Sequence, residues 1–521
     1  MTNRRASLVT LGFILVFLLL FYRVMALVLW PDPRLVGGQQ LAQSRGLIYD
    51  RHTNVLAMNV EYYDLYVRPT RFSSLQRQWL GEQLSKYSNL FESADLGLVY
   101  TNRDFVYVKR RLTFSQKEAI QTMFQSCPEK WQHDSWGFVQ TTGRYYPYLE
   151  TAKVVGYVGI DNNGLDGLEF FFDKDLKQGK NIFTTLDPLV SRIALEELVK
   201  GVHEANAEYG SVVVLSLSNR EILALVDWPF YNPNVFATIH SVSSPNYALS
   251  VAYEPGSVMK VFASTFGLEN GLVSPSESFF CGGSYDVYGT RVKDGYAHGY
   301  LTLAGIIQKS CNVGMVQVAD RFVPLRWYAT LTNLGFGSSP QLPLPGKASG
   351  ILRPLEKWSG LSKYMTSIGQ EIGVSTVQLA LALATVAGGG VYQSPTLVYG
   401  WAEAVQRRVF SSSASRQVLK MMEQVVSEKG TALSARIEGM AIAGKTGTGQ
   451  IAREDGSGYY PNFFSALFMG VFPAENPRYV IVVAVNRIHG QKHTGGEVAA
   501  PIFSRIVRRM LIQTDYVEVK P

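Results

Sequence analysis

A serine and a lysine three residues apart form the clearest chemical signal in the sequence. They lie in the stretch Tyr253-Glu-Pro-Gly-Ser-Val-Met-Lys260, where the Pro-Gly pair favours a tight turn into a helix. Residues three apart on a helix share a face, so the side chains of Ser257 and Lys260 can meet. The apolar residues that follow, up to Gly271, predict a buried helix. Burial lowers the pKa of a lysine, and a neutral amine can take the proton of a serine hydroxyl. The pair can therefore create a serine nucleophile.

Two short motifs follow this pair in order along the chain. Ser310-Cys-Asn312 lies between two apolar stretches and is predicted to form a bend between helices. Lys445-Thr-Gly-Thr448 precedes a strand-like stretch at 463–471. Each motif is weak alone and has a decoy, Ser244-Pro-Asn246 for the first and His493-Thr-Gly495 for the second. Their order along the chain and their sequence surroundings favour Ser310-Cys-Asn312 and Lys445-Thr-Gly-Thr448 over the two decoys.

The three motifs together resemble those of penicillin-binding proteins and serine β-lactamases. The stretches Tyr253-Glu-Pro-Gly, Ala443-Gly-Lys-Thr-Gly-Thr448 and 369–378 are similar to class B penicillin-binding proteins, the monofunctional transpeptidases, and most of all to the septal subgroup. The resemblance extends from Arg45 to Phe503. It implies an α/β transpeptidase domain, with an antiparallel sheet covered by helices, and no cofactor.

The resemblance also implies a role for each catalytic residue. Ser257 is the expected nucleophile and Lys260 the base, and only this pairing also follows from spacing. Ser310 is expected to relay a proton to the leaving amine. Asn312 is expected to position Lys260 and the substrate amide, and Lys445 to supply positive potential.

The third motif supplies the expected substrate-binding residues, which are Thr446, Gly447 and Thr448. The hydroxyls of Thr446 and Thr448 are expected to bind the substrate carboxylate. The backbone N–H groups of Ser257 and Thr448 are expected to form the oxyanion hole.

The implied activity is peptidoglycan D,D-transpeptidation, in which stem peptides ending in D-Ala-D-Ala are cross-linked through a serine ester and β-lactams act as inhibitors. Septal wall synthesis is the expected role, and side-wall elongation is the alternative. Other implied partners are a SEDS-family glycosyltransferase and further division-complex membrane proteins. A β-lactamase, a β-lactam sensor and an inactive scaffold are less favoured. The β-lactamase is less favoured because a single-domain hydrolase needs neither the membrane anchor nor the long N-terminal module that are described below.

Composition narrows the class of protein. The chain has 521 residues, of which 46% are hydrophobic and 17% charged, which predicts two or three folded domains. The net charge of +7 suits contact with anionic membrane or wall polymers. A clustered basic run with interleaved aromatics is absent from the sequence, which argues against nucleic-acid binding.

The cysteine pattern predicts no metal site. Cys127, Cys281 and Cys311 fit no zinc spacing and are too few for a disulfide scaffold. Three free thiols are favoured, and a Cys127–Cys281 disulfide stays open as the alternative.

The N-terminus predicts a membrane anchor. Arg4 and Arg5 precede the apolar stretch Ala6–Trp30, which is interrupted only by Arg23. A bilayer needs roughly 20 apolar residues, so this stretch suffices if Arg23 reaches the outer interface. A cleaved signal peptide is the alternative. The basic residues place 1–5 in the cytoplasm and the rest outside, on a single-pass protein of the inner (cytoplasmic) membrane with an extracytoplasmic or periplasmic catalytic domain.

Two modules are predicted beyond the anchor. Residues 31–180 form an extended α+β pedestal, the dimerisation-like domain of class B proteins, and residues 181–521 form the transpeptidase domain. In the pedestal, the arginines of Arg45–Arg51 and Arg144–Pro147 and the carboxylate of Glu169 are expected to form buried ion pairs. Thr53 stands where the family pattern usually has glycine, which puts the local turn in question. The second module is expected to contain a helix at 188–206 and strands at 211–216, 221–226, 463–472 and 479–485.

Overall fold

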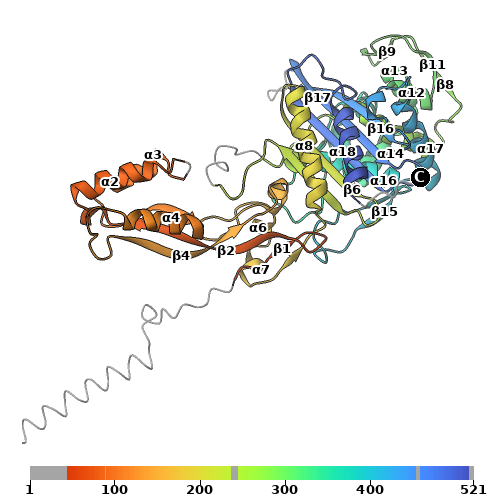
Figure 1. The fold of residues 1–521 in the computed structure, drawn as a ribbon. Coiled ribbons are helices and arrows are strands. Elements are labelled where there is room, and N and C mark those ends of the chain that lie inside the picture. The colour runs from red at the N-terminus through yellow and green to blue at the C-terminus, as the bar shows by residue number, and fades with distance from the viewer. Residues whose placement is uncertain (1–43, 89, 236–244, 453–457, 515–521) are drawn as a thin grey trace, which may run out of the picture.

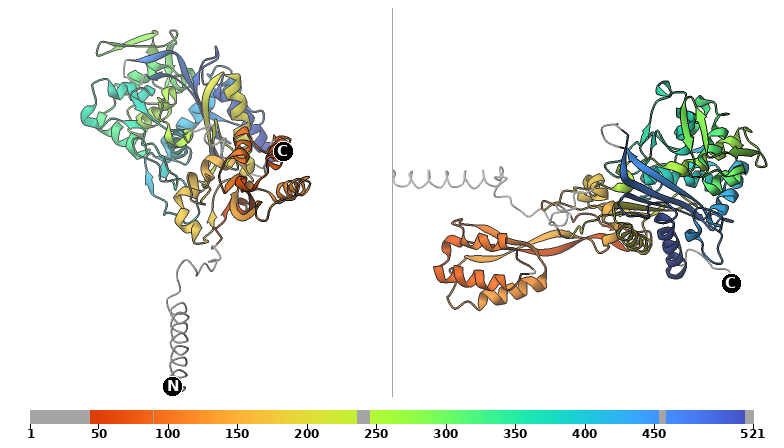
Figure 2. Two further views of the ribbon diagram at one scale, coloured as in Figure 1. Left: turned by 90° about the vertical axis from the view of Figure 1, so that its left-hand side faces the viewer. Right: turned by 90° about the horizontal axis from the view of Figure 1, so that it is seen from above.

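The computed structural model describes residues 44–88, 90–235, 245–452 and 458–514. The predicted cytoplasmic tail and anchor lie outside these ranges. Within them, no helix combines the length and the hydropathy needed to cross a bilayer. Figure 1 shows an elongated N-terminal part that extends to one side of a larger body of sheet and helices. Figure 2 shows the same extension from above.

A five-stranded antiparallel sheet is the centre of the larger body, in the order β16-β17-β18-β6-β7. The strands are β6 (Ala207–Ser216), β7 (Ile222–Trp228), β16 (Ala443–Ala452), β17 (Tyr459–Phe472) and β18 (Tyr479–Ile488). β18 is the middle strand, and Tyr479–Asn486 are buried without a break. A strand buried on both faces reads as a continuous apolar run, as this one does. The four strands predicted from the sequence are confirmed.

Helices cover both faces of this sheet. The helices that cover it are α8 (Pro188–Glu204), α11 (Met259–Glu269), α16 (Thr376–Ala387), α17 (Ser412–Glu423) and α18 (Ala499–Gln513). A Cβ on Gly210 would touch Leu198 of α8, whereas the Oγ of Ser211 lies 2.7 Å from Thr376 Oγ1 of α16. Because successive strand residues face opposite sides, α8 and α16 lie on opposite faces. The expected sheet with helical cover is therefore confirmed (Figure 1).

The remaining elements of this body connect the sheet to the site. The helices are α10 (Tyr247–Ser250), α12 (Leu303–Lys309), α13 (Asn312–Ala319), α14 (Pro324–Asn333), α15 (Ser362–Ile368) and the 3-10 turns η4 (Gly256–Val258), η5 (Leu355–Lys357), η6 (Gln424–Val426) and η7 (Leu433–Ala435). The strands are β8 (Ser278–Cys281), β9 (Ser284–Val287), β10 (Thr290–Lys293), β11 (Gly299–Thr302), β12 (Ile351–Leu352), β13 (Ile372–Gly373), β14 (Val391–Gln393) and β15 (Gln406–Arg408). β8 pairs with β11 and β9 with β10, so one hairpin is nested in the other.

The N-terminal part is built on one long strand. β2 (Val55–Val67) pairs with β1 (Ile48–Tyr49), β3 (Val106–Leu112) and β4 (Trp136–Tyr145), and β1 pairs in parallel with β5 (Ile182–Phe183). The helices are α2 (Ser74–Ser85), α3 (Ser93–Gly97), α4 (Phe114–Gln125), α5 (Ala152–Val155), α6 (Gly167–Phe171), α7 (Asp173–Lys177) and the turns η1 (Pro69–Arg71), η2 (Leu98–Tyr100) and η3 (Leu149–Thr151). Residues 65–124 bury a core of their own, whereas 48–57 and 146–186 share the core of the large sheet.

Charged side chains form buried ion pairs in the base of the N-terminal part, as expected. The carboxylate of Glu169 accepts a hydrogen bond of 2.7 Å from each of Arg45 and Arg144, and all three side chains are buried. Thr53 has φ +65°, so the turn keeps the left-handed backbone that glycine favours. The predicted ion pairs are confirmed, and the turn persists without glycine.

Candidate active site

Ser257 lies in a tight turn at the start of the buried helix. Gly256 has φ +56°, and the 3-10 turn η4 runs directly into α11. The α-helix itself begins at Met259, so Ser257 lies in the 3-10 turn that leads into it and Lys260 lies in the helix. The Nζ of Lys260 donates to the Ser257 Oγ at 2.9 Å. Lys260 is completely buried and Ser257 half-buried, so the amine meets the hydroxyl at the edge of the core.

The second motif surrounds the amine of Lys260 with acceptors. Lys260 Nζ lies 2.7 Å from Asn312 Oδ1, 2.5 Å from the Ser310 carbonyl oxygen and 3.4 Å from the Ser310 hydroxyl. Ser310 follows α12 with φ +59°, and α13 begins at Asn312. The predicted bend between helices is confirmed. Its left-handed residue turns both the carbonyl and the hydroxyl of Ser310 toward the lysine.

The third motif brings a second lysine to the same serine. Lys445 Nζ donates to the Ser310 Oγ at 2.8 Å and to the Thr446 carbonyl at 2.9 Å. The Lys-Thr-Gly-Thr residues lie inside β16 and precede β17, which contains the strand predicted at 463–471. The hydrogen bonds run from Ser257 through Lys260 and Ser310 to Lys445. The sequence therefore predicted a set of residues that the fold brings together.

Burial changes the protonation of both lysines. Loss of solvent lowers the pKa of Lys260 to about 8, although the negative charge of Asp294 opposes this shift. Burial also lowers the pKa of Lys445 well below its usual range, and the nearby charge of Lys260 adds to the effect. Two ammonium groups beside the same half-buried hydroxyl, that of Ser310, repel each other. Lys260 is consequently available as a base near neutral pH.

β16 forms the other wall of the site, since it is the edge strand of the sheet and lies against the nucleophile turn. A Cβ on Gly256 would come within 2.6 Å of the Thr448 carbonyl oxygen and 3.6 Å of its nitrogen. A Cβ on Gly447 would lie 2.7 Å from the Pro255 carbonyl oxygen. Only glycine permits this approach. The backbone of Thr448 thus lies next to Ser257, where the expected oxyanion donors belong.

Sequence reasoning missed two residues that support the third motif. Thr431 Oγ1 lies 2.7 Å from Thr446 Oγ1, so the hydroxyl of Thr446 already has a partner. Gly495 donates its N–H to the Thr448 Oγ1 at 3.2 Å. Gly495 belongs to the decoy His493-Thr-Gly, which therefore lies against the true motif and supports it. A loop threonine carries no local signal, but the Gly-Gly pair at 495–496 marked a close approach of backbones.

The fold brings together four potential metal ligands that the cysteine spacing did not reveal. Cys281, Asp294, His298 and Cys311 bring one ligand atom each to within 4.8 Å of one another. The structure has all three cysteines as free thiols, as favoured, which contradicts a Cys127–Cys281 disulfide. The ligand spacing fits no linear motif, because the nested hairpin brings the residues together.

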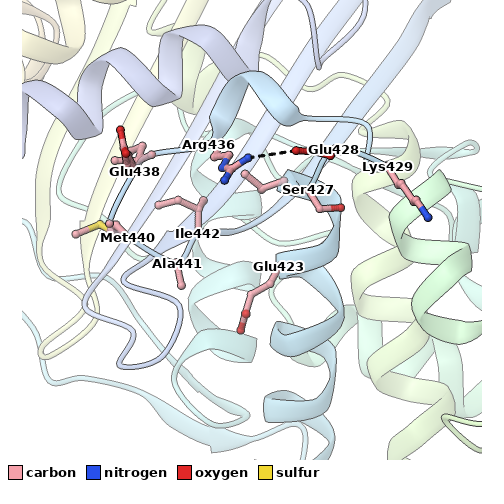
Figure 3. Close-up of a pocket in the computed structure, with 12 residues that line it drawn as sticks. Glu423, Ser427, Glu428, Lys429, Arg436, Glu438, Met440, Ala441 and Ile442 are labelled. Atoms are coloured by element: carbon pink, nitrogen blue, oxygen red, sulfur yellow. Dashed lines mark ion pairs between the residues drawn. The ribbon is translucent and has the colours of Figure 1, made fainter.

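A separate pocket is lined by residues from the end of α17 to the start of β16. Figure 3 shows residues 423–442 around it, with Arg436 paired to Glu428 at 3.9 Å. Its lining contains none of the predicted site residues. It precedes β16 in the chain and contributes no group to the serine and lysine cluster.

Comparison with known families decides the identity of this arrangement. The penicillin binding protein transpeptidase domain matches residues 210–508, more than half of the chain, and the penicillin-binding protein dimerisation domain matches 40–185. The chain belongs to the penicillin-binding protein family. With both domains in this order it is a class B penicillin-binding protein.

Relatives align along almost the whole penicillin-binding protein. The peptidoglycan D,D-transpeptidase FtsI of Escherichia coli K12 is 29% identical over 93% of this chain and 87% of its own length. The probable peptidoglycan D,D-transpeptidase PenA of Neisseria meningitidis is 29% identical over 91% of this chain and 85% of its own. Penicillin-binding protein 3 of Mycobacterium tuberculosis, solved with aztreonam, has 25% identity and a TM-score of 0.72, and the match covers 92% of this chain and 98% of that one.

Proposed function

We propose that this class B penicillin-binding protein is a peptidoglycan D,D-transpeptidase that works through an acyl-enzyme on Ser257. One observation carries the proposal: the buried amine of Lys260 lies 2.9 Å from the Ser257 hydroxyl. An amine with a pKa of about 8 can accept the hydroxyl proton near neutral pH. The relatives in Escherichia coli and Neisseria meningitidis bear the name of this activity, which supports the same substrate class here.

In the first half-reaction the Ser257 oxygen attacks the carbonyl carbon of the D-Ala-D-Ala peptide bond while Lys260 takes its proton. The oxyanion forms beside the N–H groups of Ser257 and Thr448, and losing one such donor typically costs about 2.7–4 kcal/mol of barrier. The C–N bond then breaks. The proton passes from Lys260 through the Ser310 hydroxyl, 3.4 Å away, to the departing D-Ala amine.

In the second half-reaction an amine of a neighbouring stem peptide attacks the ester. The amine loses a proton along the same path, the C–O bond to Ser257 breaks, and Ser257 recovers its proton. Asn312 holds Lys260 in place for both halves through its 2.7 Å contact. A bond to the acceptor replaces the bond to D-Ala, so the reaction needs no cofactor or redox step.

The carboxylate of the donor peptide binds beside the third motif. Thr448 is exposed on the edge strand β16, and Gly495 orients its hydroxyl from behind. Negative charge bound there raises the pKa of Lys445 and restores its positive charge. The hydroxyl of Thr446 is the second expected ligand of the carboxylate, and its 2.7 Å contact with the Thr431 hydroxyl positions it. β-Lactams mimic this donor, in line with the aztreonam complex of the Mycobacterium tuberculosis relative.

The proposed role is septal wall synthesis at the inner membrane. Tyr253-Glu-Pro-Gly and Arg144-Tyr-Tyr-Pro support the septal subgroup. Residues 6–30 anchor the chain, and the pedestal, divided from the transpeptidase domain near residue 180, holds the site away from the bilayer. A SEDS-family glycosyltransferase supplies the glycan strands. Depletion is expected to give filamentous cells, whereas rounded cells would indicate elongation instead.

The test of the catalytic assignment is covalent labelling. A fluorescent penicillin is expected to label the purified protein, with the adduct on Ser257 by peptide mass mapping. Ser257→Ala is expected to abolish labelling, and Ser264→Ala, a buried serine on the next turns of α11, serves as control. Labelling that survives Ser257→Ala, or an adduct elsewhere, would overturn the assignment. Rapid steady-state hydrolysis of a chromogenic cephalosporin would show a β-lactamase.

A further inference from the structure

Four potential metal ligands meet next to the Ser-Cys-Asn motif. One ends β8, two lie in the turn between β10 and β11, and one stands between α12 and α13. In that order they are Cys281, Asp294, His298 and Cys311, here called the thiol cluster. Both cysteines are fully buried, and the side chains of His298 and Asp294 are only 6% and 5% exposed. None of the four takes part in the proposed acyl transfer.

Four of the six distances between the ligand atoms lie near those of a tetrahedral site, and all six are within 4.8 Å. Asp294 Oδ2 lies 3.0 Å from the sulfur of Cys311, 3.3 Å from that of Cys281 and 3.8 Å from His298 Nδ1. The Cys281 sulfur lies 3.4 Å from His298 Nδ1. Zinc binds sulfur at about 2.3 Å and nitrogen or oxygen at about 2.0–2.2 Å, so its tetrahedral ligands lie about 3.3–3.8 Å apart. Small shifts would place all four around one ion.

Hydrogen bonding alone explains the thiol cluster poorly. The single oxygen Asp294 Oδ2 faces the thiols of Cys281 and Cys311, and it also accepts the N–H of Val313 at 3.0 Å. A carboxylate oxygen has about two lone pairs, and thiols are weak donors. Three donors therefore face two acceptor sites on this oxygen, and His298 Nδ1, 3.4 Å from the Cys281 sulfur, is a further possible acceptor. A cation at the centre would turn these crowded donors into ligands, because the thiols lose their protons on binding.

We propose that the thiol cluster binds one zinc ion. Thiolate and imidazole ligands select zinc over magnesium or calcium, which prefer oxygen. Binding releases one proton from each thiol and leaves two thiolates, a carboxylate and a neutral imidazole on a divalent ion. The excess negative charge meets backbone donors: Asn312 N–H lies 2.7 Å from Asp294 Oδ1, and Gly314 N–H lies 3.1 Å from the Cys311 sulfur.

Four protein ligands close the coordination shell, which marks a structural site and not a catalytic one. The ion ties the nested hairpin to the residue between Ser310 and Asn312. It thereby holds the backbone of Ser310, the proposed proton relay, and of Asn312, which contacts Lys260. It also keeps two adjacent thiols from forming a disulfide outside the cell. The proposal does not depend on the transpeptidase assignment, because metal content is measured without any substrate.

Metal analysis of the full chain tests the proposal. Protein purified in detergent without chelator is expected to carry about one zinc per chain, as a closed four-ligand site requires. Cys311→Ser and His298→Asn are expected to lose it. Cys127→Ser is the matched control, since this third cysteine lies in the pedestal after α4, and it is expected to keep the zinc.

Cobalt substitution adds a readout on the unchanged sequence. After chelation and addition of cobalt, wild type and Cys127→Ser are expected to show thiolate-to-cobalt charge-transfer bands and the strong visible absorption of a tetrahedral ion. Thermal melting is expected to move upward when zinc is returned to the stripped protein. Stripped wild type that binds neither ion, stoichiometric binding of another metal, or a native Cys281–Cys311 disulfide found by mass spectrometry would overturn the proposal.

Discussion

At the scale of single residues, the site depends on how two lysines share one serine. Ser310 accepts from Lys445 at 2.8 Å and lies 3.4 Å from the amine of Lys260. Both amines are buried, so protonating one disfavours protonating the other. The lysine that activates Ser257 is consequently neutral over a range of pH where an exposed lysine is charged. The chemistry of the site follows from this difference.

The first prediction concerns the pH dependence of acylation. The neutral fraction of Lys260 rises as pH rises through its pKa of about 8. Penicillin acylation is expected to slow about tenfold for each pH unit well below 8 and to level off above it. Lys445, Asp294 and Cys311 are titratable groups near Lys260; burial lowers the pKa of Lys260 most, and the carboxylate of Asp294 opposes this shift. Stopped-flow acylation between pH 5.5 and 9.5 measures the profile.

Lys260→Ala is the companion variant in the same experiment. Removing a general base typically costs 10²–10⁴-fold, so acylation is expected to slow by about this factor and to lose the rise below pH 8. The exposed Lys420, which pairs with Glu423, provides the control Lys420→Ala with a wild-type profile. A Lys260→Ala protein that keeps the rate and the profile would assign the base to another group.

At the scale of elements, glycines allow three backbones to meet around the nucleophile. Gly256 N–H donates to the Gly369 carbonyl at 3.1 Å, and Gly256 also lies against Thr448 of β16. Gly369 has φ +86°, and a Cβ there would come within 2.0 Å of the Gly256 carbonyl oxygen. The turn after α15 therefore buttresses η4.

The second prediction distinguishes the effect of the close contact between Gly369 and Gly256 from the effect of left-handed backbone strain alone. Gly369→Ala is expected to displace η4 and slow acylation by at least about tenfold, since a misplacement of about 1 Å can cost 10²-fold. Gly439→Ala is the matched control, because Gly439 also has positive φ, +75°, but a Cβ there meets nothing within 4 Å. Both variants carry the left-handed cost of roughly 1–2 kcal/mol. Equal acylation rates in the two would refute the buttress.

The sequence predicted the helices and strands better than the tertiary contacts between them. The pairing of Ser257 with Lys260 follows from helical spacing alone, and apolar runs such as 479–485 marked the sheet. Ser310, Asn312 and Lys445 were placed by family resemblance, because no local pattern tells where a chain returns. The thiol cluster was missed for the same reason. Cys281 and Asp294 are brought together by two nested hairpins, and this register is set by tertiary packing.

At the scale of the whole molecule, the pedestal has two different parts. Residues 65–124 enclose a separate core, while its base packs into the core of the transpeptidase sheet. The charges on Arg45, Arg144 and Glu169 lie buried within that base. Each partner of Glu169 has a further acceptor, Asp173 for Arg45 and Asn59 for Arg144. The base is thus a continuous extension of the catalytic body, and only the distal head is independent.

The last prediction concerns this buried network. Glu169→Ala leaves two guanidinium groups short of their shared carboxylate, and breaking a buried pair typically costs about 3–5 kcal/mol. Such a loss is a large part of the roughly 5–15 kcal/mol that usually stabilises a domain. Because no residue of the network contributes to the site, penicillin acylation per folded molecule is expected to stay at the wild-type rate. Urea unfolding followed by proteolysis is expected to show early cleavage between residues 45 and 180.

Glu118→Ala, which removes an exposed pair with Lys117, is expected to cost less than about 1 kcal/mol. If Glu169→Ala unfolds no earlier than Glu118→Ala, the pedestal is held by apolar packing alone. If it loses acylation while still folded, the base transmits its geometry to the catalytic site.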